Sequence, residues 1–259
     1  MKDLTLKQHR IRDPIVLASI HGINKVKAET GVDGHITGGM AVNSYLPPEL
    51  RRSSVDLDFS LYWGGDTEEF RTLTYPLICE LRERGYEAEG FQKRNLSYEL
   101  VAGSNGDSLL IQHQRRNKKN LEKNALSIQR EMANHRTVSK DGFSYDVLSP
   151  EDLVLRKMSR MIKFSGTYSI EMPRNVSIPD LTQEIERRKK ELAIRSEEYD
   201  PRLVTEIRML CDAYDIKTLA DYVGLNDNYF SEASADWVSP DISDSTLRKT
   251  LESLSVSLD

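Results

Sequence analysis

Apolar and polar residues alternate along this chain in two rhythms, one typical of strands and one typical of helices. Between residues 55 and 62 the period is two, which predicts a half-buried strand with Leu57 and Phe59 towards a core. By the same pattern, further strands are expected at 35–37, within 87–102, at 108–114 and at 143–148. Apolar residues at helical spacing predict helices at 12–29, 67–84 and 118–134.

From Ser149 onward the pattern is helical. Ser149 and Pro150 suit the N-cap and the first position of a helix, and two acidic residues follow in its first turn. Additional helices are expected from 179 to about 197, after Asp200, and near the C-terminus. The sequence therefore predicts an α+β fold in two domains, 1–148 with a sheet and 149–259 made of helices.

Two aspartates on the expected strand at 55–62 are the first candidates for chemistry. Asp56 and Asp58 are two positions apart, so on a strand both carboxylates point to the same face. Neighbouring carboxylates repel each other, and a divalent cation between them removes the repulsion. We expect Mg²⁺ here, with Mn²⁺ as a second candidate; an acidic strand edge surrounded only by water is the alternative.

A glycine pair precedes these aspartates at the start of an expected short helix. Gly38 and Gly39 expose backbone N–H groups that a phosphate can approach, because no Cβ stands in the way. Ser54, two residues before Asp56, adds a hydroxyl on the face of the carboxylates. Together these residues are typical of a site for a nucleoside triphosphate with magnesium.

The same residues carry a family resemblance. The run GGMAV at 38–42, followed by Arg52, Ser54, Asp56 and Asp58 in that order, resembles the AbiEii-type nucleotidyltransferase toxins, a branch of the DNA polymerase β-like nucleotidyltransferase superfamily. The resemblance implies a polymerase β-like domain with a mixed sheet, followed by a helical domain that closes the active site. It also implies that Asp56 and Asp58 are catalytic metal ligands and that Gly38, Gly39, Arg52 and Ser54 bind the nucleotide.

Two further motifs extend the resemblance into the helical domain. SPEDL at 149–153, followed by Lys157, matches the family's helix start and essential lysine, which implies that Lys157 is catalytic and reaches the triphosphate as a point charge. The stretch 211–216 resembles the closing motif and assigns its functional aspartate to Asp212, whereas Asp215 pairs or caps within the helices. A solvated lysine and salt-bridged helix acids are the structural alternatives.

The chain departs from the family pattern at three places. Arg160 stands where an alanine is usual, and Cys211 replaces a lysine or arginine. On the strand expected at 108–114, Gln112 and His113 occupy the positions where family members often place a third carboxylate. The departure leaves Asp56 and Asp58 to hold the metal, together with water.

The charge is distributed unevenly along the chain. Lys and Arg total 36 and Asp and Glu total 41, a net charge of −5 that argues against a general nucleic-acid coat protein. From 93 to 140, however, ten basic residues face four acidic ones. This surplus is either a solvated helix face or a phosphate-binding patch. We expect that its centre contacts an acceptor RNA, through Arg115, Arg116, Lys118 and Lys119.

The resemblance implies transfer of a nucleoside monophosphate from a nucleoside triphosphate to an acceptor hydroxyl, with release of pyrophosphate. It favours the 3′ end of an RNA such as tRNA, a toxin role, and a possible cognate antitoxin. Nucleotidylation of a protein or small molecule, and a non-catalytic nucleotide-binding module, are the alternatives. Cys79 and Cys211 suggest reduced thiols in a cytoplasm, and no apolar run is long enough to cross a membrane.

Overall fold

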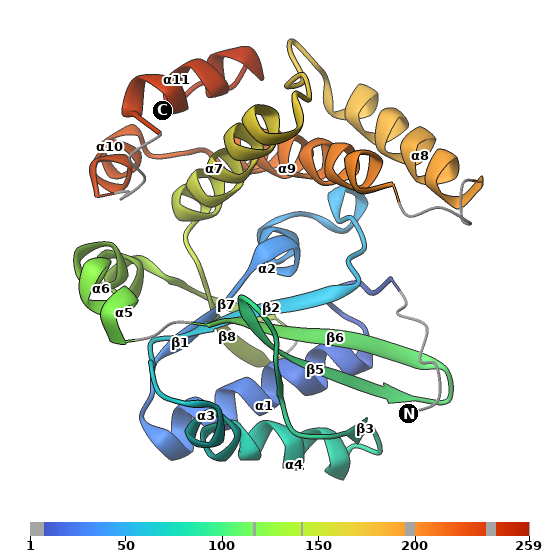
Figure 1. Cartoon of the computed structure of the whole chain (residues 1–259), viewed down its shortest axis with the longest axis vertical. Coiled ribbons are helices and arrows are strands. Elements are labelled where there is room, and N and C mark those ends of the chain that lie inside the picture. Colours follow the sequence, from blue (N-terminus) through green and yellow to red (C-terminus); the bar gives the residue numbers. More distant parts are fainter. Residues whose placement is uncertain (1–7, 116–117, 141, 195–199, 237–241, 259) are drawn as a thin grey trace. The chain divides into compact units, whose positions relative to one another are not determined.

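The structure is a computed structural model that describes residues 8–115, 118–140, 142–194, 200–236 and 242–258. The chain divides into two compact units, Met1–Ser149 and Pro150–Asp259, and each is considered by itself (Figure 1). The boundary expected after residue 148 lies one residue before this division.

The first unit is built on a mixed sheet of eight strands among the described residues. The order is β3-β5-β6-β2-β1-β8-β7, with β4 also paired to β5. Two neighbouring pairs are parallel, β2 with β6 and β1 with β8, and the others are antiparallel. The strands are β1 (Gly34–Thr37), β2 (Asp56–Leu61), β3 (Glu87–Ala88), β4 (Gln92–Lys93), β5 (Ser97–Ser104), β6 (Asp107–Gln114), β7 (Arg136–Lys140) and β8 (Phe143–Val147).

The strand β7 was not expected from the sequence. Its residues, RTVSK, are mostly polar, and β7 lies at the end of the strand order among the described residues. It is joined to β8 in an antiparallel hairpin in which Gly142 has a φ of 77°. An exposed edge strand lacks the apolar alternation on which sequence prediction depends.

Helices flank both faces of this sheet. In Figure 1, α1, α3 and α4 lie on one face and α2 on the other. The helix expected at 67–84 is interrupted at Thr74, just before Pro76, and the one expected at 118–134 is interrupted at Asn124. The helical segments are α1 (Pro14–Thr30), α2 (Gly38–Tyr45), the 3₁₀ turn η1 (Pro48–Leu50), α3 (Thr67–Leu73), α4 (Tyr75–Glu83), α5 (Lys118–Lys123) and α6 (Ala125–Asn134).

The two faces of the sheet differ in character, as the alternation in β2 predicts. Leu57 and Phe59 are buried, and an aromatic group covers the same face: Phe70 of α3 stacks on Tyr98 and His113, with ring centroids 4.1 and 4.9 Å apart. Burial of these large side chains supplies the main driving force for the unit's folding. The opposite face of β2 carries the half-buried aspartates.

The second unit consists of helices among the described residues. The long α9 packs against both α7 and α8. The sequence led us to expect one helix near the C-terminus, but two are present, α10 and α11. The N-cap of α10, Asn226, accepts a hydrogen bond from the Tyr229 amide. The helices are α7 (Pro150–Tyr168), α8 (Ile178–Ile194), α9 (Pro201–Val223), α10 (Asp227–Ala235) and α11 (Asp244–Ser253).

The α+β class with a mixed sheet, followed by a helical unit, is confirmed. In the part of the chain that the structure describes, no helix combines the length and the apolar character needed to cross a membrane.

Candidate functional site

The glycine pair and the aspartates meet where β1 passes into α2. Thr37, the last residue of β1, is in register with Asp58 of β2, so the next residue, Gly38, lies directly against the Asp58 side chain. Gly38 has a φ of 69°, and a Cβ at this position would collide with the Asp58 carboxylate. The glycine is therefore required twice, for its backbone conformation and for the space it leaves beside the acid.

The second glycine is placed against a cation. A Cβ on Gly39 would approach the Arg52 guanidinium to 2.7 Å. The segment that carries Arg52 is attached to α2 by Asn43, whose buried amide donates to the Arg52 carbonyl at 2.6 Å. A carboxylate, a guanidinium and the first turn of a helix are thus gathered around two residues without side chains, an arrangement suited to phosphate groups and a metal ion.

Asp56 is held by the serine two positions before it. The Ser54 hydroxyl donates to Asp56 Oδ1 at 2.5 Å, and Ser54 itself pairs with His9 through two backbone hydrogen bonds of 2.7 and 2.9 Å. His9 is buried, and its Nε2 lies 2.8 Å from the Ser108 carbonyl. The serine expected to bind a nucleotide therefore also orients the neighbouring aspartate.

Strand register extends the acidic face beyond β2. Asp58 is in register with Gln112 of β6, and Gln112 is in register with Glu99 of β5. Residues in register on adjacent strands point to the same face, so Asp58, Gln112 and Glu99 form one row, which we call the Asp58 row. Two strand spacings of about 4.8 Å separate the ends of the row, roughly 10 Å in total.

Sequence reasoning did not identify Glu99. Its Oε1 accepts hydrogen bonds from Ser97 at 2.7 Å and from Gln112 at 3.0 Å, and its Oε2 lies 3.4 Å from Arg94 Nε. The alternation of β5 shows that Glu99 opposes the core, but only the pairing of β5 with β6 places it in the Asp58 row.

Of the two candidates for a third carboxylate position, only Gln112 faces the aspartates. His113 points to the core, where it is buried against Phe70. A glutamine beside Asp58 supplies an amide instead of a third charge, and that amide is directed to Glu99.

The donor set at Asp56 and Asp58 suits magnesium. No cluster of three or more potential metal-binding side chains occurs within the described residues. Mg²⁺ is commonly bound by one or two carboxylates and by phosphate oxygens of the substrate, so a complete protein cage is not needed. The two aspartates lie on one face beside Gly38 and Gly39, which we call the glycine cradle, and this arrangement fits that mode of binding.

In the second unit the predicted lysine and aspartate lie together. Lys157 Nζ is 2.6 Å from Asp215 Oδ2 and 3.3 Å from Asp212 Oδ1, and all three side chains are buried. Arg160 donates to Asp212 through two nitrogens, at 2.7 and 2.5 Å. Lys157, Arg160, Asp212 and Asp215 therefore form a balanced group of two cations and two carboxylates, which we call the charged cluster.

The charged cluster gives Arg160 a structural role. Arg160 follows Lys157 by three positions on α7, so both side chains reach α9 from the same side of the helix. Arg160 neutralises Asp212, which leaves Lys157 closest to Asp215. Asp215 thus has the pairing role that the sequence suggested for it, and Lys157 is not a solvated surface lysine.

The basic residues after β6 are only partly described. Arg115 is half-buried and Lys119 is exposed, whereas Arg116 lies outside the described residues, as does the side chain of Lys118, the first residue of α5. The Arg115 guanidinium donates to the carbonyls of Arg94 and Asn95, at 2.8 and 3.0 Å, so it supports the turn between β4 and β5.

Comparisons with known proteins show a distant structural likeness. No protein-family model and no curated protein matches the sequence. The chain is similar to an antigenic nucleotidyltransferase-like protein from Paracoccidioides brasiliensis, with 12% identity, 95% of each chain covered and a TM-score of 0.47. It is also similar to the antibiotic-resistance factor ANT(2'')-Ia, with 10% identity, 85% of this chain and 89% of the other covered, and a TM-score of 0.37. These likenesses are too distant to assign an activity, and the proposals below rest on this chain's own residues.

Proposed function

We propose that this protein is a nucleotidyltransferase that transfers a nucleoside monophosphate from a nucleoside triphosphate to an acceptor hydroxyl. The observation that carries the proposal is the close approach of charged side chains to both glycines. A Cβ on Gly38 would collide with the Asp58 carboxylate, and a Cβ on Gly39 would displace the Arg52 guanidinium. A purely structural turn would need glycine at most for its φ. Here both glycines also make room for the charged groups that a metal-bound triphosphate requires.

Each group of residues in the site has a separate role in the proposed reaction. Asp56 and Asp58 would hold Mg²⁺, which neutralises the charge on the phosphates when it is bound. The first turn of α2 and Arg52 would bind phosphate oxygens through N–H donors. The acceptor oxygen then attacks the α-phosphorus in line, the bond to the bridging oxygen of the β-phosphate breaks, pyrophosphate leaves, and the acceptor proton passes to a carboxylate or to water.

We assign to Lys157 a contact with a phosphate oxygen and to Asp212 the support of the charged cluster. An ammonium has three N–H donors. Among the residues that the structure describes, the partners of Lys157 Nζ are Asp212 and Asp215, so a third donor remains for a phosphate. The two carboxylates fix the ammonium in one position, which reduces the entropy lost when it binds an anion.

For the acceptor we propose the 3′ hydroxyl of an RNA, with tRNA as the first candidate. The basic surplus between 93 and 140 supports a polyanionic acceptor, because phosphates are bound chiefly by Lys and Arg. The toxin role and a cognate antitoxin follow from the family resemblance and are part of the proposal. Growth arrest on expression of the wild type, and not of Asp58→Asn, would support that role.

The test is incubation of the purified chain with Mg²⁺, each α-³²P-labelled nucleoside triphosphate and total cellular RNA. We expect a labelled RNA band and stoichiometric pyrophosphate, both abolished by EDTA and by Asp58→Asn. Label in protein or in a small molecule would replace the RNA acceptor with the alternative acceptors. Calorimetric nucleotide binding without pyrophosphate release would contradict catalysis and identify a binding module.

A further inference from the structure

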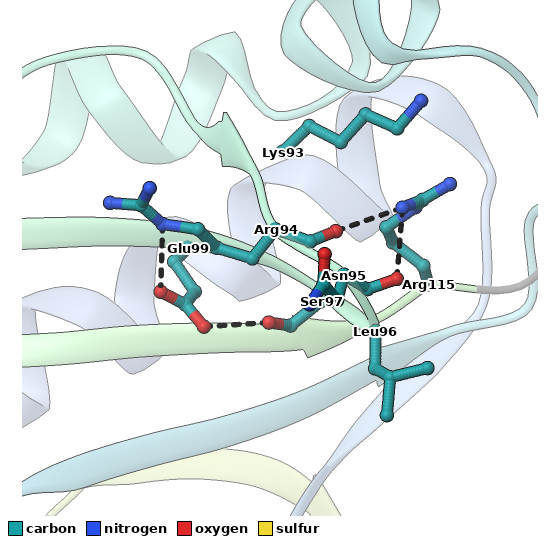
Figure 2. Close-up of a pocket in the computed structure, with 7 residues that line it drawn as sticks. All are labelled: Lys93, Arg94, Asn95, Leu96, Ser97, Glu99 and Arg115. Atoms are coloured by element: carbon teal, nitrogen blue, oxygen red, sulfur yellow. Dashed lines mark hydrogen bonds and ion pairs between the residues drawn. The ribbon is translucent and has the colours of Figure 1, made fainter.

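A pocket of about 770 Å³ lies at the turn between β4 and β5, and it is separate from the glycine cradle. The turn 93–97, Glu99 and Arg115 line it (Figure 2). Three of these residues are cations, Lys93, Arg94 and Arg115, against the single carboxylate of Glu99. Even with the Arg94–Glu99 ion pair counted as neutral, Lys93 and Arg115 leave the lining positively charged, so the pocket attracts anions.

An apolar side chain projects from the same turn. Leu96 is 81% exposed and is preceded by the exposed residues Lys93, Arg94 and Asn95. In Figure 2 the Leu96 side chain points away from Arg94 and Glu99. A leucine in water at the tip of a basic turn gains no burial in the folded chain, so its apolar surface is available to a ligand.

Hydrogen bonds from Arg115 hold the turn in place. Arg115 donates through its guanidinium to the Arg94 and Asn95 carbonyls and through its backbone N–H to the Leu96 carbonyl, at 2.8, 3.0 and 2.9 Å. The Arg115 guanidinium carbon also lies 5.8 Å from the ring centroid of the buried Tyr98. A turn fixed in this way loses little conformational entropy when it binds a ligand.

The pocket shares a face with the proposed catalytic aspartates. Glu99 is both part of its lining and the end of the Asp58 row. Glu99, the lining residue that belongs to the Asp58 row, lies two strand spacings from Asp58, roughly 10 Å.

From these observations, and resting on the proposed function, we infer that the β4–β5 turn binds the acceptor as single-stranded RNA. Lys93, Arg94 and Arg115 contact its phosphates, and Leu96 packs against the face of an unpaired base. A duplex offers only its phosphates and stacked bases, whereas a single strand offers both phosphates and accessible base faces. The combination of cations with an exposed leucine therefore favours a single strand.

The test uses the full chain with Lys93→Ala and Leu96→Ser combined, since both side chains are exposed. The matched control combines Lys190→Ala and Ile194→Ser on α8, also an exposed lysine and an exposed apolar residue. Binding of a short fluorescein-labelled single-stranded RNA is measured by anisotropy over a series of salt concentrations. The same sequence as a duplex and the binding of Mg–ATP by calorimetry are measured in parallel.

We expect the turn variant to raise the Kd for the single strand about tenfold and to lower the salt slope by about 0.7, the share of one phosphate contact. The control and Mg–ATP binding should be unchanged, and the duplex should bind more weakly than the single strand to the wild type. An unaltered Kd and slope, or equal losses in the control, would overturn the inference.

The outcomes separate this inference from the proposed function. If the wild type labels a protein or small molecule and binds no RNA, the RNA site is refuted while nucleotidyl transfer stands. If RNA binds through the turn but neither Mg–ATP binding nor pyrophosphate release is found, the site stands and the proposed function fails.

Discussion

The acidic face of the sheet and the charged cluster of the second unit use the same residue types in opposite ways. On β2, Asp56 and Asp58 are half-buried. The Asp58 row leads from Asp58 through Gln112 to a further carboxylate, that of Glu99. In the charged cluster, Asp212 and Asp215 are fully buried and each is paired with a cation at 2.7 Å or less.

The buried charged cluster and the half-buried aspartates of β2 are suited to different roles. Buried charges must be paired, since leaving one without a partner costs several kcal/mol. The charged cluster therefore contributes first to the integrity of its unit. The half-buried carboxylates of β2 share one face, and Gly38 leaves room for one of them; we propose that a cation from solution binds there.

The largest effect is expected from Asp58→Asn. Loss of one metal carboxylate should reduce transfer roughly 10³-fold, or about 4 kcal/mol of transition-state stabilisation, because the amide binds Mg²⁺ poorly. The melting temperature should stay within a degree or two of the wild type. Single-turnover labelling of RNA and calorimetry provide the two measurements; near-normal turnover with Mg²⁺ would refute the two-aspartate site.

Lys157→Ala should have the opposite signature and destabilise the second unit by about 3 kcal/mol, since the buried Asp215 carboxylate loses the ammonium that lies 2.6 Å from it. Denaturant unfolding measures this change, and Lys163→Ala, an exposed lysine on the same helix, is the control. Activity is compared under conditions where the variant is folded. Loss of stability without loss of transfer would make Lys157 purely structural.

Gly38→Ala sharpens the comparison at the glycine cradle. The added Cβ should displace the Asp58 carboxylate and lower transfer by a factor of about 30, or about 2 kcal/mol. Gly31→Ala is a matched control, because Gly31 has the same φ of 69° with no atom within 4 Å of its Cβ position. Both variants pay the cost of a left-handed residue, about 1–2 kcal/mol of stability. Equal activities of the two variants would show that the contact with Asp58 has no catalytic importance.

The smallest effect concerns Asp146, an aspartate of the first unit that is ion-paired as in the charged cluster. Burial alone would raise the pKa of Asp146, but hydrogen bonds from Lys27 and Thr137 outweigh it and hold the pKa below 3.8. A lowered folded-state pKa stabilises the protein above the unfolded value, and this stabilisation disappears as the pH falls through the folded value. Asp146→Asn should therefore cost about 1 kcal/mol at pH 7.

The pH dependence of that cost is the measurement. The difference in unfolding free energy between wild type and Asp146→Asn should shrink as the pH falls below 3.8. A difference that stays constant over this range would mean that the asparagine acts through packing and not through charge.

The sequence by itself determined the elements whose pattern is local. The alternation around Asp56 and Asp58 fixed both the strand and the side of it that faces the core, because side chains on a strand alternate strictly. The start of α7 at Pro150 followed from its N-terminal residues. Where the pattern was weak, as in the polar edge strand β7, or where a proline interrupts an apolar run, as at Pro76, prediction failed.

Only the tertiary structure decided which distant residues meet. Gln112 and His113 are neighbours in the sequence, yet Gln112 lies beside Asp58 and His113 lies in the core. The register of β6 against β2 decides which of the two faces the aspartates. Glu99 joins the Asp58 row through a second register, and Arg160 reaches Asp212 because α7 and α9 pack together. Register and helix packing are set by the whole core, and for that reason no local pattern could have revealed these partners.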